Sequence, residues 1–296
     1  MRVRIRPTEA VHAAALVVLT ALTIALRHRL DNPGGLLLVY LILFGVLVLV
    51  TWLVPKEDRL PAPLDFLIDF YPAVFLPILF NMLEPLIAAL RGGARDDLLI
   101  AIDRAMFGVD VSVWMQRFAR PLVNDVFYCF YATYYFLALT LGLILWLRDR
   151  PAARRFVFTL MVVYYVSYAG YFIVPALGPR FAQANLYTVS LTETPVSRFI
   201  NDTINSLEKT KFDVFPSGHT MVSVAVLLVA WKRARDVFWW LLPIATGLII
   251  STVYCRFHYV IDLIAGASLA VVTVPFADWL YDRWTGRQVA REVARA

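Results

Sequence analysis

Two histidines of this chain stand where long apolar runs begin. The stretch Phe215 to His219 (FPSGH) directly precedes one run, and His258 precedes another, with Asp262 four residues after it. Residues four apart share one face of a helix, so the Asp262 carboxylate can fix the tautomer of His258 and raise the basicity of its second ring nitrogen. A histidine that acts as a nucleophile or general base requires such a partner.

The residues before His219 are suited to hold an anion. Ser217 and Gly218 lie where the next apolar run would begin as a helix, and free N–H groups and the positive end of the helix dipole attract anions there. Glycine lets a ligand approach the backbone closely, and serine can cap the helix or bind an oxygen. Arg180 and Arg256 add planar guanidinium groups that match the geometry of phosphate oxygens.

Together these side chains predict phosphoryl transfer through a histidine. One histidine would attack phosphorus, the other would protonate the leaving oxygen, and the arginines and amides would stabilise charge on the remaining oxygens. His219, His258 and Asp262 could also be combined into a metal site, but the neighbouring arginines repel a cation and favour an anion. We therefore predict no metal and no other cofactor.

The same residues resemble the signatures of a membrane enzyme family. FPSGH and the pattern His-Tyr-x-x-Asp from His258 to Asp262 are similar to the second and third signatures of the phosphatidic acid phosphatase type 2 superfamily. The stretch GYFIVPALGPR, which ends at Arg180, resembles the first signature of the branch that contains inositol phosphorylceramide synthases and related bacterial membrane proteins. The resemblance covers about residues 95–280.

This resemblance implies a role for each residue. His258 would be the nucleophile that forms a phosphohistidine, Asp262 would orient it, and His219 would be the general acid. The phosphate would be held by Arg180, Ser217, Gly218 and an arginine of the third signature. No metal is implied.

The chain departs from the common signatures at several positions. Ile173 stands where the first signature has a lysine, and Phe181 stands where it has a proline after the arginine. Ser251 is followed by Thr252 rather than by the arginine of the third signature. Arg256, two residues before the histidine, is the candidate to replace that arginine.

The composition predicts an all-α, polytopic integral membrane protein. Of the 296 residues, 60% are hydrophobic and 17% are charged, against roughly 45–50% and 25% in soluble domains. A membrane-spanning helix needs about 20 apolar residues. Apolar runs occur at 10–27, 34–54, 66–90, 122–147, 156–177, 216–231, 237–255 and 257–280. We expect about eight transmembrane helices, and the resemblance implies a six-helix catalytic bundle of the phosphatidic acid phosphatase type 2 kind.

Basic residues predict the orientation of the chain. The loops 148–155 and 231–236 are short and rich in arginine and lysine, as cytoplasmic loops are. We interpret the net charge of +6 as this topological signal and not as a surface for nucleic acid. The first run lacks a small-residue cleavage site, so we expect it to be an uncleaved span. By alternation we expect both termini in the cytoplasm and the site at the periplasm or exterior of a bacterial inner or plasma membrane.

Four segments are expected along the chain. They are the N-terminal transmembrane helices (1–60), a third span with an amphipathic outer-surface helix (61–121), the catalytic helical core (122–283) and a cytoplasmic tail (284–296). The amphipathic helix would either guide a lipid or serve as a surface connector. Asp69 and Glu84 interrupt the third span, and carboxylates at such positions are either functional or paired with another helix.

The favoured interpretation is a metal-independent membrane lipid phosphatase with its site at the outer membrane face. It would hydrolyse a lipid phosphate or pyrophosphate, with a membrane phospholipid or an isoprenoid phosphate as substrate. One alternative is a phosphotransferase that moves a phospho-headgroup from a phospholipid to a lipid or alcohol acceptor, as an inositol phosphorylceramide synthase does. The other is a non-catalytic lipid transporter, which would tolerate the loss of His258.

Overall fold

The described part of the chain is helical throughout. The structure, a computed structural model, describes residues 5–53, 61–207 and 210–293, and within these ranges it contains helices and turns but no strand. The helices are α1 (Pro7–Ala25), α2 (Pro33–Leu53), α3 (Ala62–Phe70), α4 (Pro72–Phe80), α5 (Leu83–Arg91), α6 (Asp96–Phe107), α7 (Val111–Met115), α8 (Pro121–Ala132), α9 (Tyr134–Arg148), α10 (Arg150–Ile173), α11 (Pro179–Ala182), α12 (Pro195–Leu207), α13 (Gly218–Arg233), α14 (Arg235–Tyr254) and α15 (Val260–Val293). The predicted all-α fold is confirmed.

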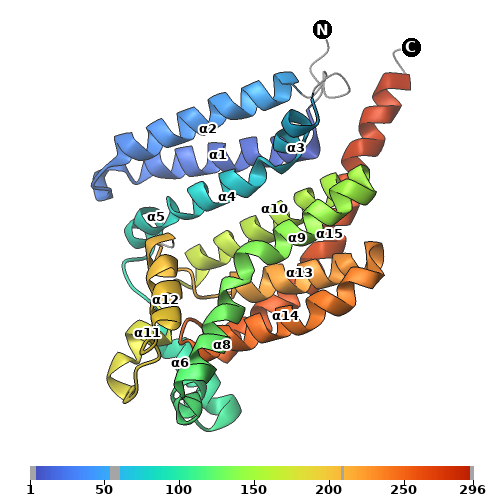
Figure 1. Cartoon of the computed structure of the whole chain (residues 1–296). Coiled ribbons are helices and arrows are strands. Elements are labelled where there is room, and N and C mark those ends of the chain that lie inside the picture. The colour runs from blue at the N-terminus through green and yellow to red at the C-terminus, as the bar shows by residue number, and fades with distance from the viewer. Residues whose placement is uncertain (1–4, 54–60, 208–209, 294–296) are drawn as a thin grey trace.

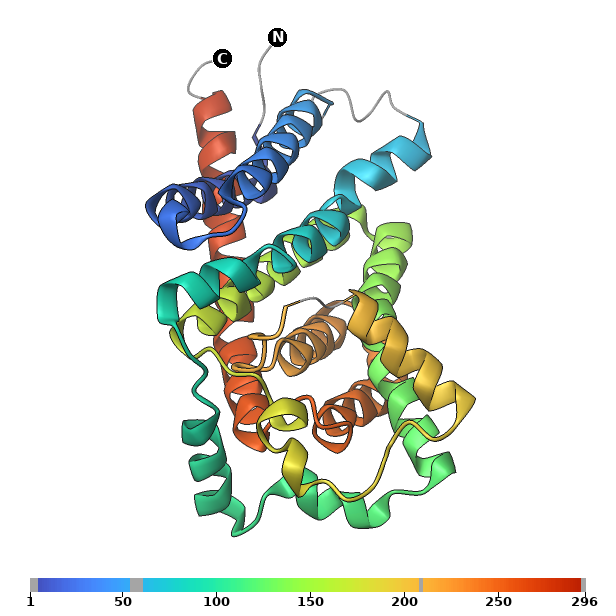
Figure 2. The same ribbon diagram turned by 90° about the vertical axis from the view of Figure 1, so that its left-hand side faces the viewer.

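Helix α13 forms the centre of the bundle. It packs against α9, α10, α14 and α15, which surround it in the view of Figure 2. Its buried face includes Ala225 and Ala230, and small side chains let neighbouring helices approach closely. A Cβ atom on Gly266 of α15 would lie 2.6 Å from the carbonyl oxygen of Ser217. Glycine at this position therefore lets the start of α15 pack directly on the start of α13.

The first five helices form a second layer beside α10. Helix α1 packs on α2 and α10, and α4 and α5 also contact α10. The layer covers one side of the bundle, as Figure 1 shows, and buries leucines such as Leu43, Leu79 and Leu86. Helix α4 is thereby held next to the catalytic bundle.

Several helices are long and apolar enough to cross a membrane. By length and composition six described helices qualify: α1, α2, the α3–α4 segment, α10, α14 and α15. The pair α8 and α9, which bends by 44°, would add a seventh. Helix α13 fills the sixth predicted crossing, but its 16 residues are fewer than such a span requires. The prediction of a polytopic α-helical membrane protein is confirmed.

Two segments that the sequence presents as continuous are broken in the structure. The third predicted span, 66–90, is divided into α3, α4 and α5, because Pro72 starts a new helix and Asn81 ends α4. The expected amphipathic helix at 95–121 ends at Phe107, where Gly108 takes a left-handed φ of 71°. The expectation of a single helix there was wrong.

The two ends of the bundle differ in character. The start of α1 and the last turns of α15 lie at the same end (Figure 1), where the indole N–H of Trp284 donates to the carbonyl of Ile5 at 3.4 Å. The basic loops that were predicted to be cytoplasmic also lie there, since Arg148 pairs with Asp236. Helices α6, α11 and α12 gather at the opposite end. The side of the membrane that each end faces stays a prediction.

Asp69 belongs to a buried ion cluster at the end that holds the termini. Its carboxylate, 4% exposed, accepts hydrogen bonds of 2.9 Å from each of Arg6, Arg150 and Arg154. The indole N–H of Trp146 adds a fourth at 3.2 Å. The cluster joins the start of α1 to α3, α9 and α10. Of the two expected roles for this carboxylate, function or pairing with another helix, the structure shows the pairing.

Candidate active site

The structure brings His219 and His258 together at the end of the bundle opposite the termini. Nδ1 of His219 lies 3.2 Å from Nε2 of His258, and the two rings meet edge to face with centroids 5.4 Å apart. His219 lies in the first turn of α13 and is 7% exposed, while His258 precedes α15 and is 3% exposed. A phosphorus atom that reaches one imidazole is therefore within reach of the other.

Asp262 lies behind His258, on the side away from His219. Its Oδ2 is 3.4 Å from Nδ1 of His258 and accepts a 2.7 Å hydrogen bond from the N–H of Tyr259. At 3.4 Å the contact with the ring is longer than an ordinary charge-assisted hydrogen bond. Since the carboxylate faces Nδ1, the nitrogen of His258 that is available to attack is Nε2.

A left-handed turn presents His258 to the site. Arg256 has a φ of 68°, which residues other than glycine rarely adopt. The chain then folds back on α14, and the carbonyl of Thr252 accepts hydrogen bonds from the N–H groups of Phe257 (2.8 Å) and His258 (3.1 Å). Backbone conformations of this kind are concentrated at functional sites, where the surrounding structure holds them in place.

Ser217 caps α13 and links it to α15. Its Oγ accepts a hydrogen bond from the N–H of Thr220 at 3.2 Å, and its own N–H donates to the carbonyl of Asp262 at 3.0 Å. Of the two roles expected for this serine, the structure shows the cap. Gly218 and His219 lie in the first turn of α13, whose N–H groups point toward the start of the helix. They are the donors that a phosphate oxygen could bind.

Arg180 lies beside the histidine pair on α11. Its guanidinium stacks over the ring of Phe257 at 4.5 Å and over that of Phe181 at 4.7 Å. Its Nη1 also donates to Oδ1 of Asn205 on α12 at 3.0 Å. Phe181, which replaces the proline of the common signature, thus supports the guanidinium. Phe257 is the residue before His258, so the arginine is held next to the predicted nucleophile.

The side chain of Arg256 points to the outer loop. Its guanidinium stacks over the ring of Tyr187 at 3.8 Å, and Nη2 donates to the carbonyl of Val189 at 2.8 Å. Within the described part of the chain, its guanidinium forms no hydrogen bond or ring contact with His219 or His258. The contacts hold the loop that follows α11, and the role of Arg256 as a phosphate ligand stays a prediction.

Asp103 of α6 supports the start of α15. Its carboxylate is 3% exposed and accepts hydrogen bonds from the N–H groups of Val260 (2.8 Å) and Ile261 (2.9 Å). These are first-turn N–H groups of the helix that carries Asp262, and they would otherwise lack a partner. The sequence placed Asp103 among the charges of an amphipathic surface helix, so this function was missed.

Asp96, at the start of the same helix, supports the loop that leads to Arg180. It accepts hydrogen bonds from the N–H groups of Leu177 (2.9 Å) and Gly178 (2.8 Å) and from the hydroxyl of Tyr259 (2.8 Å). Gly178 has a φ of 85°, and a Cβ atom there would lie 2.7 Å from the carbonyl of Phe257. Helix α6 therefore braces both the first and the third signature.

Asp213 and Glu84 add negative charge close to the site. Burial raises the pKa of Asp213 and the charge of Glu84 adds to the rise, while the charges of His258 and Arg180 lower it. Asp213 also lines the cavity that contains His219. The sequence signal that could have revealed Asp213 is an acidic residue directly before the otherwise apolar VFP of the histidine signature.

The imidazole of His258 is held in its neutral form. Burial lowers the pKa of His258 to about 4, although the charge of Asp213 acts in the opposite direction, and the positive charge of Arg180 lowers it further. A neutral imidazole has the free lone pair that a nucleophile needs. At neutral pH the protein does not have to remove a proton from His258 before it can attack.

Comparison with known proteins gives the same assignment. The model of the PAP2 superfamily matches residues 97–276, which include both histidines and Asp262. A PA-phosphatase related-family protein of Dictyostelium discoideum is 30% identical over 122 residues, covering 40% of this chain and 22% of that protein. The bacitracin transport permease protein BcrC of Bacillus licheniformis is 29% identical over 161 residues, covering 53% of this chain and 71% of BcrC. No solved structure matches the chain significantly. The family model spans the site and covers more than half of the chain. This integral membrane protein therefore belongs to the PAP2 superfamily.

Proposed function

We propose that this protein is a metal-independent lipid phosphatase that hydrolyses a lipid phosphate or pyrophosphate through a phosphohistidine. The observation that supports it best is the buried pair of His219 and His258, with nitrogens 3.2 Å apart and Asp262 behind the second ring. Arg180 and the first-turn N–H groups of α13 supply the positive groups that a transferring phosphoryl needs. The site would face the periplasm or exterior, with both termini in the cytoplasm.

The reaction would proceed in two displacements. Nε2 of His258 attacks phosphorus and the bond to the leaving oxygen breaks. His219, protonated when the anionic substrate is bound, gives that oxygen its proton and becomes neutral. His219 then takes a proton from water, the resulting hydroxide attacks the phosphohistidine, and Nε2 leaves with its electron pair. Asp262 stabilises the positive charge that develops on the His258 ring during each displacement. The products are a lipid alcohol, or a lipid monophosphate from a pyrophosphate, and inorganic phosphate.

A phosphotransferase is the second candidate, and Asp213 favours it. An alcohol that accepts the phosphoryl group must lose its hydroxyl proton, and a carboxylate with a raised pKa is suited to take it. Asp213 lies in the same cavity as His219 and acts electrostatically on His258. In this case the acceptor would be a lipid or alcohol, as in inositol phosphorylceramide synthases.

A non-catalytic lipid transporter is the third candidate. It is favoured by the name of one relative, a bacitracin transport permease, of which the match covers 71%. A transporter needs no paired imidazoles with an orienting carboxylate, so it would keep its activity when His258 is replaced.

One experiment separates the three candidates. Purified protein in mild detergent with EDTA would be given phosphatidic acid, an isoprenyl pyrophosphate, or phosphatidylinositol with ceramide. Free phosphate and new phospholipids would be followed together in the wild type, in His258→Ala and in His28→Ala, whose histidine is exposed and lies between α1 and α2.

Each outcome has a distinct meaning. Phosphate release that disappears in His258→Ala but not in His28→Ala supports the phosphatase. A new phosphodiester lipid without free phosphate supports the transferase. Activity that survives His258→Ala, or that EDTA abolishes, contradicts the phosphohistidine mechanism.

A further inference from the structure

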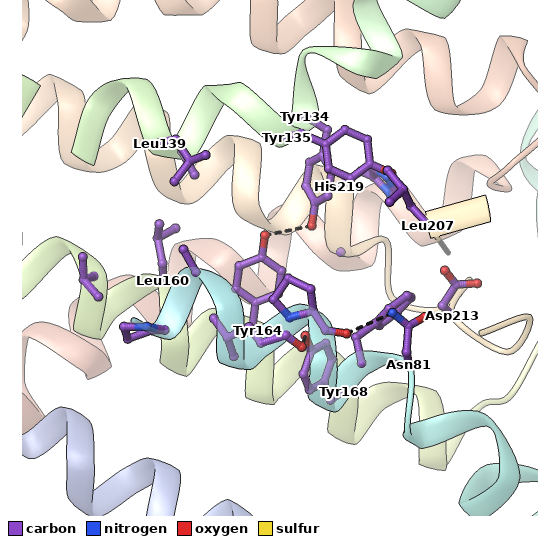
Figure 3. Close-up of a pocket in the computed structure, with 18 of the residues that line it drawn as sticks. Asn81, Tyr134, Tyr135, Leu139, Leu160, Tyr164, Tyr168, Leu207, Asp213 and His219 are labelled. Carbon is purple, nitrogen blue, oxygen red and sulfur yellow. Dashed lines mark hydrogen bonds between the residues drawn. The ribbon is translucent and has the colours of Figure 1, made fainter. Parts of the chain in front are cut away.

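A cavity of about 450 Å³ extends from the catalytic histidine into the bundle. It lies between α4, α9 and α10, and Gly218, His219 and Asp213 line its outer end. Figure 3 shows His219, Asp213 and Asn81 at one end and Leu139 and Leu160 at the other. Its volume is in the range of small-molecule binding sites, roughly 300–1,000 Å³.

The long axis of the cavity follows the helices. On α10 its wall runs from Tyr171, beside the start of α13, to Val157. These two residues are fourteen positions apart, and at 1.5 Å per residue the wall is about 21 Å long. The hydrocarbon core of a bilayer is about 30 Å thick. The cavity therefore extends through most of that depth, much further than a phosphate headgroup would require.

The polarity of the wall changes along this axis. Polar side chains are concentrated at the outer end, and the ring of Tyr134 stacks near His219 with centroids 4.2 Å apart. The hydroxyl of Tyr134 donates to that of Tyr164 at 3.0 Å. Beyond this tyrosine pair the wall is aliphatic and aromatic, including Leu76, Leu160 and Phe156. Such a surface binds hydrocarbon and offers little to a sugar or a peptide.

The wall of the cavity includes exposed residues of α4 and α9. Ala73 and Pro77 of α4 and Leu139 of α9 line the cavity and are exposed, Leu139 by 46%. These residues belong to membrane-spanning segments, so the surface they share meets lipid. A lipid can thus enter sideways while its headgroup stays at the outer end.

We infer that this cavity binds one hydrocarbon chain of the substrate, with its phosphate at the histidine pair and its chain between α4, α9 and α10. The inference rests on the proposed function for the position of the phosphate. Helices α3 and α4 precede residues 97–276, so this chain adds its own wall to the family's catalytic bundle. Both acyl and isoprenyl chains have the required chemistry.

The first test uses a substitution that fills the cavity. Ala138→Trp places an indole one turn below Tyr134, and Leu143→Trp places the same group on the exposed, lipid-facing side of α9 as a control. Each protein would be assayed with a long-chain alkyl phosphate, an isoprenyl phosphate and 4-nitrophenyl phosphate. Excluding a few methylenes lowers the ratio of kcat/KM for the long chain to that for 4-nitrophenyl phosphate by about tenfold or more. Leu143→Trp should keep the wild-type ratio.

Comparison of the alkyl phosphate with the isoprenyl phosphate also identifies which kind of hydrocarbon chain the cavity binds. A larger loss with the alkyl phosphate assigns the cavity to acyl chains, and a larger loss with the isoprenyl phosphate assigns it to isoprenoids. An unchanged ratio in Ala138→Trp, or an equal change in the control, overturns the inference.

A binding measurement separates this inference from the proposed function. A long-chain phosphate with a photoreactive group at the chain end would be crosslinked to the purified protein. Labelled peptides from α4, α9 or α10 that disappear in Ala138→Trp support the inference even if no substrate is hydrolysed. Labels confined to other helices overturn it, whereas a wild type that binds the probe without cleaving any phosphate contradicts only the proposed function.

Discussion

At the scale of single residues, the chemistry depends on which nitrogen of each imidazole faces which group. Asp262 faces Nδ1 of His258, and His219 faces its Nε2. In the proposed mechanism the two nitrogens of this ring would have different tasks, because Nδ1 faces the carboxylate and Nε2 would attack. Arg180 stacks on Phe257, so the group that would bind phosphate is mounted on the residue next to the nucleophile.

The pKa of His258 provides a test at this scale. Burial lowers it to about 4, against roughly 6.5 for an unperturbed histidine. At a pH between these two pKa values, the imidazole of His258 in the folded protein is neutral and keeps its free lone pair. An exposed histidine would be mostly protonated at the same pH. Titration of the ring signals by NMR in detergent micelles, assigned by their loss in His258→Gln, should give an apparent pKa near 4. A value of 6.5 or above would mean that the ring is not buried as the structure describes.

At the scale of elements, the site is built from helix ends. Four helix ends meet at the site: the start of α13, the end of α14, the start of α15 and the short helix α11. Helix α6 supports them from outside. The two aspartates of α6 that do this are buried, whereas Asp97 between them in the sequence is exposed. The helix that the sequence presented as a lipid guide or surface connector is therefore also a structural support for the site.

Asp103 provides the test at this scale. Replacing it by alanine removes the acceptor of two N–H groups at the start of α15, and misplacing catalytic groups by about 1 Å can cost about 100-fold in rate. We expect kcat to fall by about 10- to 100-fold in Asp103→Ala with little change in KM. Asp103→Asn, which keeps one acceptor, should restore part of the activity.

Asp97→Ala is the matched control for Asp103, because it removes an exposed acid of the same helix. It should behave as the wild type in the same assay. Thermal unfolding would be recorded for all three variants. If the loss of rate in Asp103→Ala merely followed a loss of folded protein, the positioning role would be refuted.

At the scale of the whole molecule, the two ends of the bundle have separate tasks. One end holds the charged cluster around Asp69, which joins α1, α3, α9 and α10. The other end holds the histidine pair. The N-terminal layer connects them, since α4 packs on α10 and lines the cavity that leads to His219.

Asp69 provides the test at this scale. In Asp69→Asn three arginines lose one carboxylate partner, and breaking a buried pair costs about 3–5 kcal/mol. Arg6 and Arg150 keep a second partner, Glu9 and Asp65. Because these arginines are 14–30% exposed, we expect a loss of about 2–3 kcal/mol and an unfolding temperature lower by several degrees. Asp236→Asn, in an exposed pair with Arg148, should change stability little. Hydrolysis of 4-nitrophenyl phosphate per folded molecule should be unchanged in both variants, and a selective loss of it in Asp69→Asn would show that the two ends are coupled.

The sequence alone determined the local features of this protein. His258 was expected to share a helix face with Asp262, but it lies in the turn before α15. The residues FPSGH form a capped helix start, and the apolar runs predict helices of membrane length. Each depends on neighbours within a few residues, so periodicity and capping rules suffice. The all-α membrane fold was predicted in this way, and the roles of the site residues stay predictions.

The tertiary structure decided the features that depend on contacts between distant segments. His219 and His258 are 39 residues apart, and only the packing of α13 on α15 brings them together. Periodicity gave no sign that Asp103 is buried, because a charge on an amphipathic helix resembles a solvated one until it meets the free N–H groups of another helix. The direction of Arg256, the position of Asp213 and the cavity beside α4 likewise follow from which side chains of separate helices come within reach of one another, which no local pattern specifies.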